Sequence, residues 1–441
     1  MFDTLPKAPV DRPVQCLADE RPDLLSPDSP AGLRLVQITN DASGVHAHVY
    51  MESHIFTPDS RRLVFRRILN HGEKIPINIR QDYLLCDIAD GFTIRQLTDE
   101  PGATAPAITP DGRFMYYLLD QAPAPDRGRW VLRRVCLQSF RRETVLVIDN
   151  PLPGTRCRPS FCTTLSSMSA DGERLCTSGY LGDGVRPNGP FGVVVFDLAR
   201  ATAEAIMESP TFSNAHPQYC RCPDPESKHD ILVQENHGDQ VGADGRGDRT
   251  LPKTDASGAD VHVIRDDGTQ FRTMPWGRDG QEFCTGHQCW RGRIPSAVAG
   301  VSRVGRDVPV VEGKPGPADS SAPHRGRETP GAVRNEICRE MPLPMFSHFA
   351  FDPTGTRFVS DCMRPGAGNW ANAQIVVGSL PDTPDAVLKV RYLLESGTSF
   401  QNPQATHPHP FPSPDATKAF FNSDVTGQPQ IWMVEGFEFP E

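Results

Sequence analysis

The chain has 441 residues, of which 43 are proline and 37 are glycine, so an all-β fold of short strands joined by turns is favoured over long helices. The formal net charge is −10, and no Lys/Arg block is long enough to follow a phosphate backbone, which excludes a nucleic-acid-binding protein. The chain has no basic start followed by an apolar segment, and no run of about 18 apolar residues, so we expect a soluble, cytoplasmic protein without a membrane partner.

The twelve cysteines form no recognisable metal-binding motif. Cys220 with Cys222 and Cys157 with Cys162 are close pairs in the sequence, and neither has CxxC spacing. Reduced thiols are the default where no export signal is present. We therefore predict buried or partly buried thiols rather than disulfides or a zinc ribbon.

A short phrase recurs along the chain: a Pro/Ala-Asp-Gly-like turn, usually a basic residue, and then an apolar strand. The five clear copies are residues 57–65, 109–117, 169–176, 351–359 and 413–421, and two weaker copies are residues 222–233 and 294–301. Seven units at intervals of roughly 50 to 70 residues lie at and just above the periods of propeller arrays. The sequence thus predicts a single domain over residues 1–441, a seven-bladed β-propeller.

Further strand pairs between these copies are expected to form the outer half of each blade. The pairs are residues 83–88 with 93–97 and 192–197 with 203–207; residues 261–264 and 430–434 are later strands of the same kind. Residues 35–38 are expected to join the last blade and close the ring. Residues 238–258 and 305–329 are rich in polar residues, Gly and Pro, which predicts two exposed insertions.

The densest group of candidate ligands is the segment Gln404-Ala-Thr-His407-Pro-His409-Pro. On an extended strand His407 and His409 point to the same face, and Gln404 is within reach three residues earlier. Imidazole nitrogens and an amide oxygen suit a divalent transition metal. The alternative interpretation is a stiff surface turn.

Six other histidines precede or begin repeat units or their strands, and many of them fall at a similar phase of the repeat, which in a propeller would bring them together at one end of the central channel. They are His46, His48, His216, His237, His287 and His348. Each one taken alone is more often a hydrogen-bonded structural residue. Their recurrence in phase favours a functional role for His287 and His216.

The last part of the chain resembles the oligogalacturonate lyases, which are seven-bladed β-propellers that cleave pectin-derived oligouronides. The resemblance rests on the 404–410 segment, the Ser-Pro-Asp at 413–415 and the Phe-Asn-Ser-Asp-x-x-Gly at 421–427. It implies a divalent metal such as manganese (Mn²⁺), held by three His and one Gln. The matching residues here are His287, Gln404, His407 and His409. His287 stands in Thr-Gly-His-Gln-Cys-Trp, where the family has Thr-His-Glu-Phe-Trp.

The resemblance also implies a catalytic base. The family's His in a Gly-His-Pro segment is similar to His216 in Ala-His-Pro, and we hold His237 and His348 in reserve. The family's Arg partner of this base has no counterpart in residues 192–197. Arg221, just beyond His216, is the candidate for that role.

These residues suit a β-elimination on a short acidic oligosaccharide. A metal bound to the uronate carboxylate would offset its charge, and a neutral imidazole outside the metal set would remove the C5 proton. The alternatives are a lyase for a different uronate-containing glycan and a non-catalytic binding propeller of the TolB type. A serine hydrolase is disfavoured because no GxSxG occurs. A glycosidase would need a carboxylate pair, and too many Asp and Glu stand in turns to nominate one.

Overall fold

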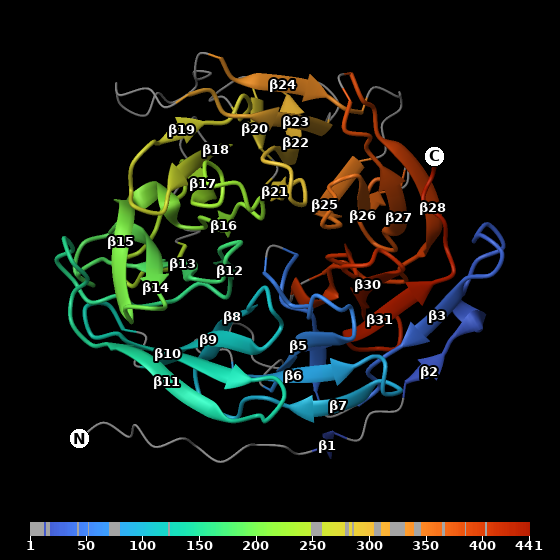
Figure 1. Cartoon of the computed structure of the whole chain (residues 1–441), viewed down its shortest axis with the longest axis horizontal. Coiled ribbons are helices and arrows are strands. Elements are labelled where there is room, and N and C mark those ends of the chain that lie inside the picture. The colour runs from blue at the N-terminus through green and yellow to red at the C-terminus, as the bar shows by residue number, and fades with distance from the viewer. Residues whose placement is uncertain are drawn as a thin grey trace.

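Seven antiparallel sheets surround a central axis like the blades of a propeller (Figure 1). The computed structural model describes residues 13–14, 18–41, 44–51, 53–69, 80–121, 124–247, 258–277, 282–284, 286–303, 310–317, 331–338, 345–363, 367–383, 385–401 and 404–441. The sequence prediction of a seven-bladed all-β propeller is confirmed.

The first four blades follow one another in chain order, each with its first strand nearest the axis. Blade 1 contains β4 (Val45–Ala47), β5 (Arg62–Ile68), β6 (Gln81–Asp87) and β7 (Thr93–Gln96), with β1 (Pro13–Val14) added at its outer edge. Blade 2 contains β8 (Ala103–Ile108), β9 (Phe114–Gln121), β10 (Arg129–Cys136) and β11 (Arg142–Ile148). Blade 3 contains β12 (Ser166–Met168), β13 (Arg174–Tyr180), β14 (Phe191–Asp197) and β15 (Thr202–Ser209). Blade 4 contains β16 (Gln218–Tyr219), β17 (Asp230–His237), β18 (Gly258–Arg265) and β19 (Arg272–Thr273).

The last three blades complete the ring. Blade 5 contains β20 (Glu282–Cys284), β21 (Cys289–Trp290), β22 (Ala297–Arg303), β23 (Val310–Lys314) and β24 (Val333–Glu336). Blade 6 contains β25 (Met345–Phe351), β26 (Arg357–Met363), β27 (Gln374–Ser379) and β28 (Lys389–Glu395). Blade 7 contains β29 (Phe411–Pro412), β30 (Lys418–Ser423), β31 (Gln430–Glu435), β3 (Arg34–Gln37) and β2 (Asp19–Glu20).

The ring is closed by hydrogen bonds between the two ends of the chain. Strand β3 pairs antiparallel with β31, so a strand from the N-terminal part becomes an outer strand of the last blade. This pairing is the ring closure that the sequence predicted for residues 35–38. It ties residues about 400 positions apart in sequence into one sheet and so holds the first and last blades of the ring together.

The recurring phrase is a hairpin turn with its own hydrogen-bond pattern. In blade 2 Thr109 Oγ1 donates to Asp111 Oδ1 at 2.6 Å, and that carboxylate oxygen accepts the Arg113 backbone N–H at 3.0 Å. Gly112 has φ +71°, a conformation that glycine adopts without strain. The same pattern joins Ser169 to Asp171 and Ser413 to Asp415. The short Thr/Ser, Asp and Gly spacing therefore specifies the turn locally.

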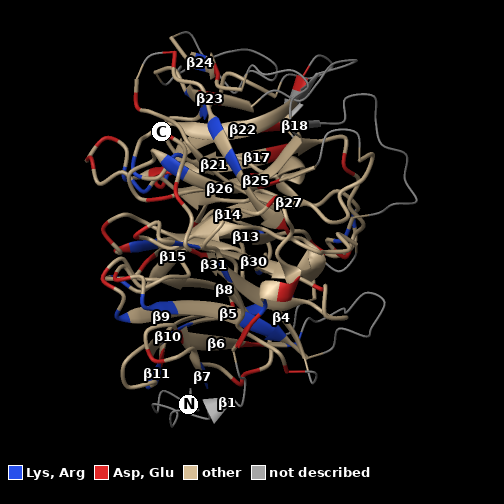
Figure 2. Cartoon of the chain, turned by 90° about the vertical axis from the view of Figure 1, so that its right-hand side faces the viewer, with Lys and Arg blue, Asp and Glu red and all other residues tan. Residues whose placement is uncertain are grey.

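The middle strands of a blade are apolar because neighbouring blades cover both of their faces. The third strand of blade 3, β14, is buried from Phe191 to Phe196, whereas its outer neighbour β15 has exposed and half-buried positions throughout. In the side view Lys/Arg and Asp/Glu occur together along the loops and strand ends (Figure 2).

One of the two predicted insertions needs correction. Val310–Lys314 within the predicted insertion 305–329 forms β23, the third strand of blade 5, and its first four residues are buried. Its two valines are apolar enough for a buried strand in the middle of a blade, although the residues around them are polar. Residues 304–309 and 318–330 lie outside the described part of the chain. In the 238–258 segment Val241 pairs with Gly247 in an isolated bridge, and residues 248–257 are not described.

The described residues contain no α-helix, only the short 3₁₀ helices η1 (Pro22–Leu24), η2 (Pro210–Phe212) and η3 (Gln404–Thr406). No helix in this part of the chain is long and apolar enough to cross a membrane. The eleven described cysteines are free thiols, as the sequence predicted.

Candidate active site at one mouth of the channel

A single position of the repeat supplies most of the histidines. The first hairpin turn of each blade begins at a residue whose backbone N–H donates to a carbonyl across the turn, and we call this the turn-start residue. The seven turn-start residues are Thr57, Thr109, Ser169, Cys220, Arg291, Asp352 and Ser413. The residue four positions before each turn-start residue occupies what we call the channel position. It is occupied in chain order by Ser53, Ala105, Leu165, His216, His287, His348 and His409.

Four consecutive blades, the fourth to the seventh, thus carry histidine at the same place. Because equivalent positions of neighbouring blades face one another across the axis, these imidazoles meet at one end of the channel. Four residues of extended chain separate them from the turns by about 13 Å. The turns therefore lie towards the other end.

The backbone departs from regular strand at these positions. His216 has φ +44° and His409 has φ +42°, and each precedes a proline, as does Ala105 with φ +50° at the same place in blade 2. His287 lies in a break between β20 and β21, which both pair with β22. His348 lies where the pairing of β25 with β26 shifts register between Phe346 and Phe349. Such strain costs about 1–3 kcal/mol per residue, and it clusters at functional sites.

The imidazole rings are in contact. The ring centroids of His287 and His348 are 4.1 Å apart, and those of His348 and His409 are 4.3 Å apart. His407 lies 5.6 Å from His409, measured in the same way. Tyr50 completes the group, with its ring centroid 4.8 Å from His409 and 5.4 Å from His216. We call His216, His287, His348, His407 and His409 the histidine mouth.

One of these imidazoles is fixed by a buried carboxylate. His348 Nδ1 lies 2.8 Å from Asp361 Oδ2, and the backbone N–H of His348 donates to Asp361 Oδ1 at 2.7 Å. Both side chains are almost fully buried. A carboxylate behind an imidazole fixes the orientation of the ring and leaves Nε2 directed away from it.

Two ring nitrogens at this mouth have no hydrogen bond within the described part of the chain. They are Nε2 of His348 and Nε2 of His409, and both are buried. A buried polar atom without a partner is costly, and a cation that accepts a nitrogen lone pair would remove that cost. The donor set therefore fits a divalent transition metal in its chemistry. No three His, Cys, Asp or Glu of the described ranges, however, stand as an assembled ligand group.

Burial sets the charge of the site. It lowers the pKa of His287, His348 and His409 well below the usual value, and the neighbouring imidazoles lower it further. Burial also lowers the pKa of His407, and it raises the pKa of Asp361 to about 7. The imidazoles are therefore neutral at pH 7, which is the form that binds metals.

The predicted ligands are only partly brought together. His287, His407 and His409 lie in the histidine mouth, and Phe400 stacks on His407 with 4.1 Å between the ring centroids. Gln404 lies in η3 and its side chain is exposed. Among the described contacts it bonds to none of these imidazoles.

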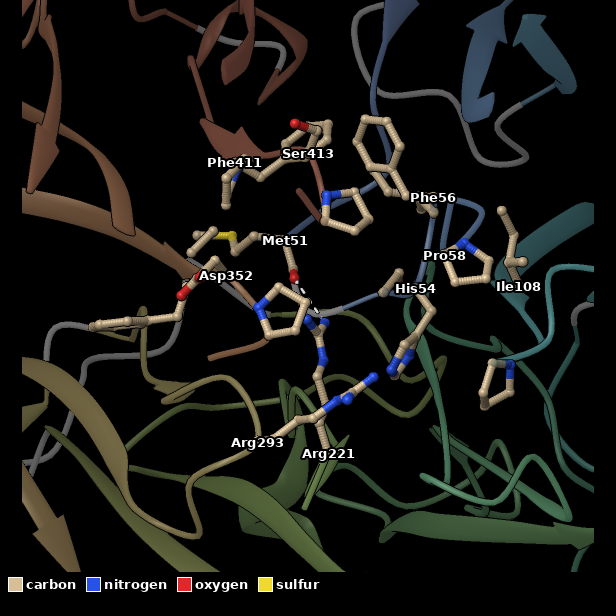
Figure 3. Close-up of a pocket in the computed structure, with 18 of the residues that line it drawn as sticks. Met51, His54, Phe56, Pro58, Ile108, Arg221, Arg293, Asp352, Phe411 and Ser413 are labelled. Atoms are coloured by element: carbon tan, nitrogen blue, oxygen red, sulfur yellow. Dashed lines mark hydrogen bonds between the residues drawn. The ribbon is translucent and has the colours of Figure 1, made fainter. Parts of the chain in front are cut away.

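The predicted catalytic residues lie in three different places. His216 is at the histidine mouth beside Tyr50. His237 ends β17 in a buried group within blade 4, where its Nε2 is 3.0 Å from Asp260 Oδ2. Arg221 follows β16, lines a cavity among the hairpin turns and donates to the Met51 carbonyl at 3.4 Å (Figure 3). None of the five histidine-mouth residues is among the described residues of the cavity wall.

Sequence reasoning gave His348 a minor role and missed Asp361 and Tyr50. Counting back four residues from each hairpin turn would have put His348 level with His287 and His409. No comparable pattern marks Asp361, which lies on a second strand, or Tyr50, which lies between β4 and the first turn.

The chain is similar to two solved structures of oligogalacturonate lyases. The lyase from Vibrio parahaemolyticus has a TM-score of 0.67 and 17% sequence identity, over 97% of this chain and 99% of that chain. An oligogalacturonate lyase in complex with manganese has a TM-score of 0.66 and 17% identity, over 98% of this chain and 99% of that chain. No protein-family profile and no curated protein matches the sequence. The comparisons show a shared fold over nearly the whole chain, the fold that the resemblance in sequence implied.

Proposed function

We propose that the protein is a metal-dependent polysaccharide lyase that cleaves short 4-linked uronate oligosaccharides by β-elimination. The observation that carries this proposal is the occurrence of histidine at the channel position of four consecutive blades. A structural role for one buried histidine is common, but the buried, neutral imidazoles of His287, His348 and His409, which contact one another in sequence, gain nothing in stability from being together. The shared fold with oligogalacturonate lyases supports the substrate class.

We assign the metal site to His287, His407 and His409, with Gln404 as the amide oxygen donor implied by the resemblance. A divalent metal bound there would act as a Lewis acid on the substrate carboxylate. The chain's own contribution is to keep the imidazoles neutral through burial and to hold the rings in place through strained backbone. Asp361 adds a fixed orientation for His348 beside them.

His216 is the base in this proposal. It shares the mouth with the ligand set but belongs to another blade, and its partial burial leaves it open to a bound sugar. Its imidazole would take the proton from C5 of the uronate, the C4=C5 double bond would form as the C4–O bond breaks, and the released oxygen would take a proton from water. Tyr50 packs against its ring and limits the directions in which it can turn.

The experiment uses di- and trigalacturonate as substrates and follows the ultraviolet absorbance of the unsaturated product, with manganese present and after chelation. We expect turnover that needs the metal. His409→Ala should lose both stoichiometric metal and turnover. His229→Ala should keep both, because His229 bonds Asp266 elsewhere in blade 4 at 2.9 Å.

Two outcomes would overturn the proposal. One is a manganese-loaded parent that leaves every uronide intact, which would favour a binding propeller. The other is a His409→Ala variant that retains stoichiometric manganese, which would place the metal elsewhere.

A further inference from the structure

The end of the channel away from the histidine mouth contains a cavity of about 240 Å³ (Figure 3). Its wall is built from the turn regions of all seven blades, and much of it is proline and other apolar residues, namely Met51, Ile55, Phe56, Pro58, Pro110, Pro353, Phe411, Pro412 and Pro414. Pro58 and Arg293 are exposed, so the cavity opens to solvent. We call it the arginine mouth, because two arginines line it.

The two arginines come from adjacent blades. Arg221 follows β16 of blade 4, and Arg293 lies in the first turn of blade 5, where its backbone N–H donates to the Pro353 carbonyl at 3.1 Å. The Arg293 side chain has no ion pair or hydrogen bond with the described residues. A guanidinium carries five N–H donors, so together the two side chains bring a large donor capacity to one small space.

The other polar groups of the wall are already engaged. Asp352 is the one carboxylate among the described lining residues, and it accepts from Thr354 Oγ1 at 2.7 Å and from the Arg357 backbone N–H at 3.1 Å. The lining hydroxyls of Thr109 and Ser53 donate to Asp111 Oδ1 and the Ser166 carbonyl.

The remaining polar side chains of the wall add no negative charge to the cavity. Ser413 donates to Asp415 Oδ1 at 2.5 Å. His54 is neutral at pH 7, because burial and then Arg221 lower its pKa well below the usual value. Among the described lining residues, two arginines thus stand beside a single aspartate.

We propose that the arginine mouth binds one small monocarboxylate with an apolar body, an aromatic or aliphatic acid. The carboxylate matches the planar fork of a guanidinium, and the body packs against the proline and phenylalanine wall. The cavity is smaller than the roughly 300–1,000 Å³ of sites for drug-sized ligands, so it suits a single ring rather than an oligosaccharide. This proposal does not depend on the lyase activity.

The test measures binding of benzoate and of its neutral isostere benzamide by calorimetry. We expect the parent protein to bind benzoate at least about tenfold more tightly than benzamide, since hydrogen bonds to charged groups are the stronger ones. Arg293→Gln should weaken benzoate about tenfold or more while leaving benzamide unchanged. Arg221→Gln should act in the same direction. Arg200→Gln is the matched control, because that exposed arginine pairs with Asp197 on the outside of blade 3.

A second comparison separates the two ends of the channel. His409→Ala should bind benzoate as the parent does; loss of binding in that variant would put the carboxylate at the histidine mouth and overturn the proposal. Equal affinity for benzoate and benzamide would overturn it too, as would parent-like benzoate binding by Arg293→Gln. So would a parent that binds no benzoate at millimolar concentration.

Discussion

The two mouths of the channel are built from the same seven repeats but differ in what their residues are free to do. At the arginine mouth the Thr/Ser and Asp side chains of the repeat are used up by the hairpin turns, as between Thr109 and Asp111. At the histidine mouth the channel position contributes no side chain to the turn four residues later. It can therefore vary from Ala105 in blade 2 and Leu165 in blade 3 to His409 in blade 7, while Ser53, its counterpart in blade 1, lines the arginine mouth. A repeat fixes the residues that make its own turns and leaves the opposite end available for chemistry.

The largest expected effect concerns His216. His216→Ala should lower kcat on a cleaved uronide by about 10²- to 10⁴-fold, the usual contribution of a positioned general base. Its metal content should stay at the parent level, because His216 is outside the assigned ligand set. Elemental analysis and the absorbance assay on one preparation check both statements.

The same substitution at His229 provides the control, and near-parent turnover by His216→Ala would assign the base to another residue. His237 is the less suitable reserve, since it is bonded to Asp260 within blade 4. A loss of metal together with turnover would instead place His216 among the ligands.

The next effect tests whether polar bonds hold the histidine mouth together. Asp361→Ala removes the acceptor of two buried donors, the backbone N–H of His348 and its Nδ1–H. Each buried group left without a partner costs about 1–3 kcal/mol, so the free energy of unfolding should fall by at least that amount.

The conservative variant gives this prediction a sharper form. Because burial raises the pKa of Asp361 to about 7, the parent loses stability as this buried acid ionises between pH 6 and pH 8, whereas Asn stays neutral; Asp361→Asn should therefore cost more at pH 6 than at pH 8. Urea unfolding at both pH values measures the difference. Equal losses for Ala and Asn at both pH values would contradict the role of the Asp361–His348 pair.

The sequence predicted the fold better than the site, for physical reasons. The turns are local, so the Thr/Ser, Asp and Gly spacing identified the blades, and the closing strand at residues 35–38 followed from the need to satisfy an edge. Contacts across the channel are not local. His348 was predicted only as a reserve, although it touches His287 and His409, and Asp361 had no visible pattern. The same limit applies to Arg221, whose closeness to His216 in sequence does not place it at the same mouth.

The pH dependence of stability follows from the buried imidazoles. Burial lowers the pKa of His46 to about 4 and of His48 to about 3. Between pH 6 and pH 5 the unfolded chain binds protons at these residues and the folded chain does not, so stability falls as pH falls. Each contributes up to about 1.4 kcal/mol per pH unit. Asp361 acts in the opposite direction, since between pH 7 and pH 4 the folded state keeps a proton that the unfolded state releases.

Two histidines against one aspartate give a net loss of about 1.4 kcal/mol per pH unit on acidification for these three groups. The lowered pKa values of His54, His287, His348 and His409 add to this loss, and Asp120, whose pKa burial raises to about 6, subtracts from it. Urea unfolding at pH 6.0, 5.5 and 5.0 measures this slope, with those pH values chosen to lie between roughly 4 and 6.5. His48→Gln should flatten it, whatever its effect at pH 7. An unchanged slope in that variant would show that His48 is not held neutral by the fold.

The smallest effect probes the turns of the arginine mouth. Gly112 has φ +71°, and a Cβ there would lie 2.7 Å from Cδ of Pro58, which lines the cavity. Gly91 in the turn between β6 and β7 has φ +63° with no atom within 4 Å of such a Cβ. Both Gly→Ala variants take on about 1–2 kcal/mol of left-handed strain, offset by about 0.4–1 kcal/mol of lost freedom in the unfolded chain. Gly91→Ala should therefore cost about 0.5–1 kcal/mol, and Gly112→Ala should cost more because Pro58 must also move. Thermal or urea unfolding of the two variants measures the cost of the contact between the added Cβ at position 112 and Pro58. Equal losses in the free energy of unfolding would mean that Pro58 moves aside without cost where the turns of neighbouring blades meet.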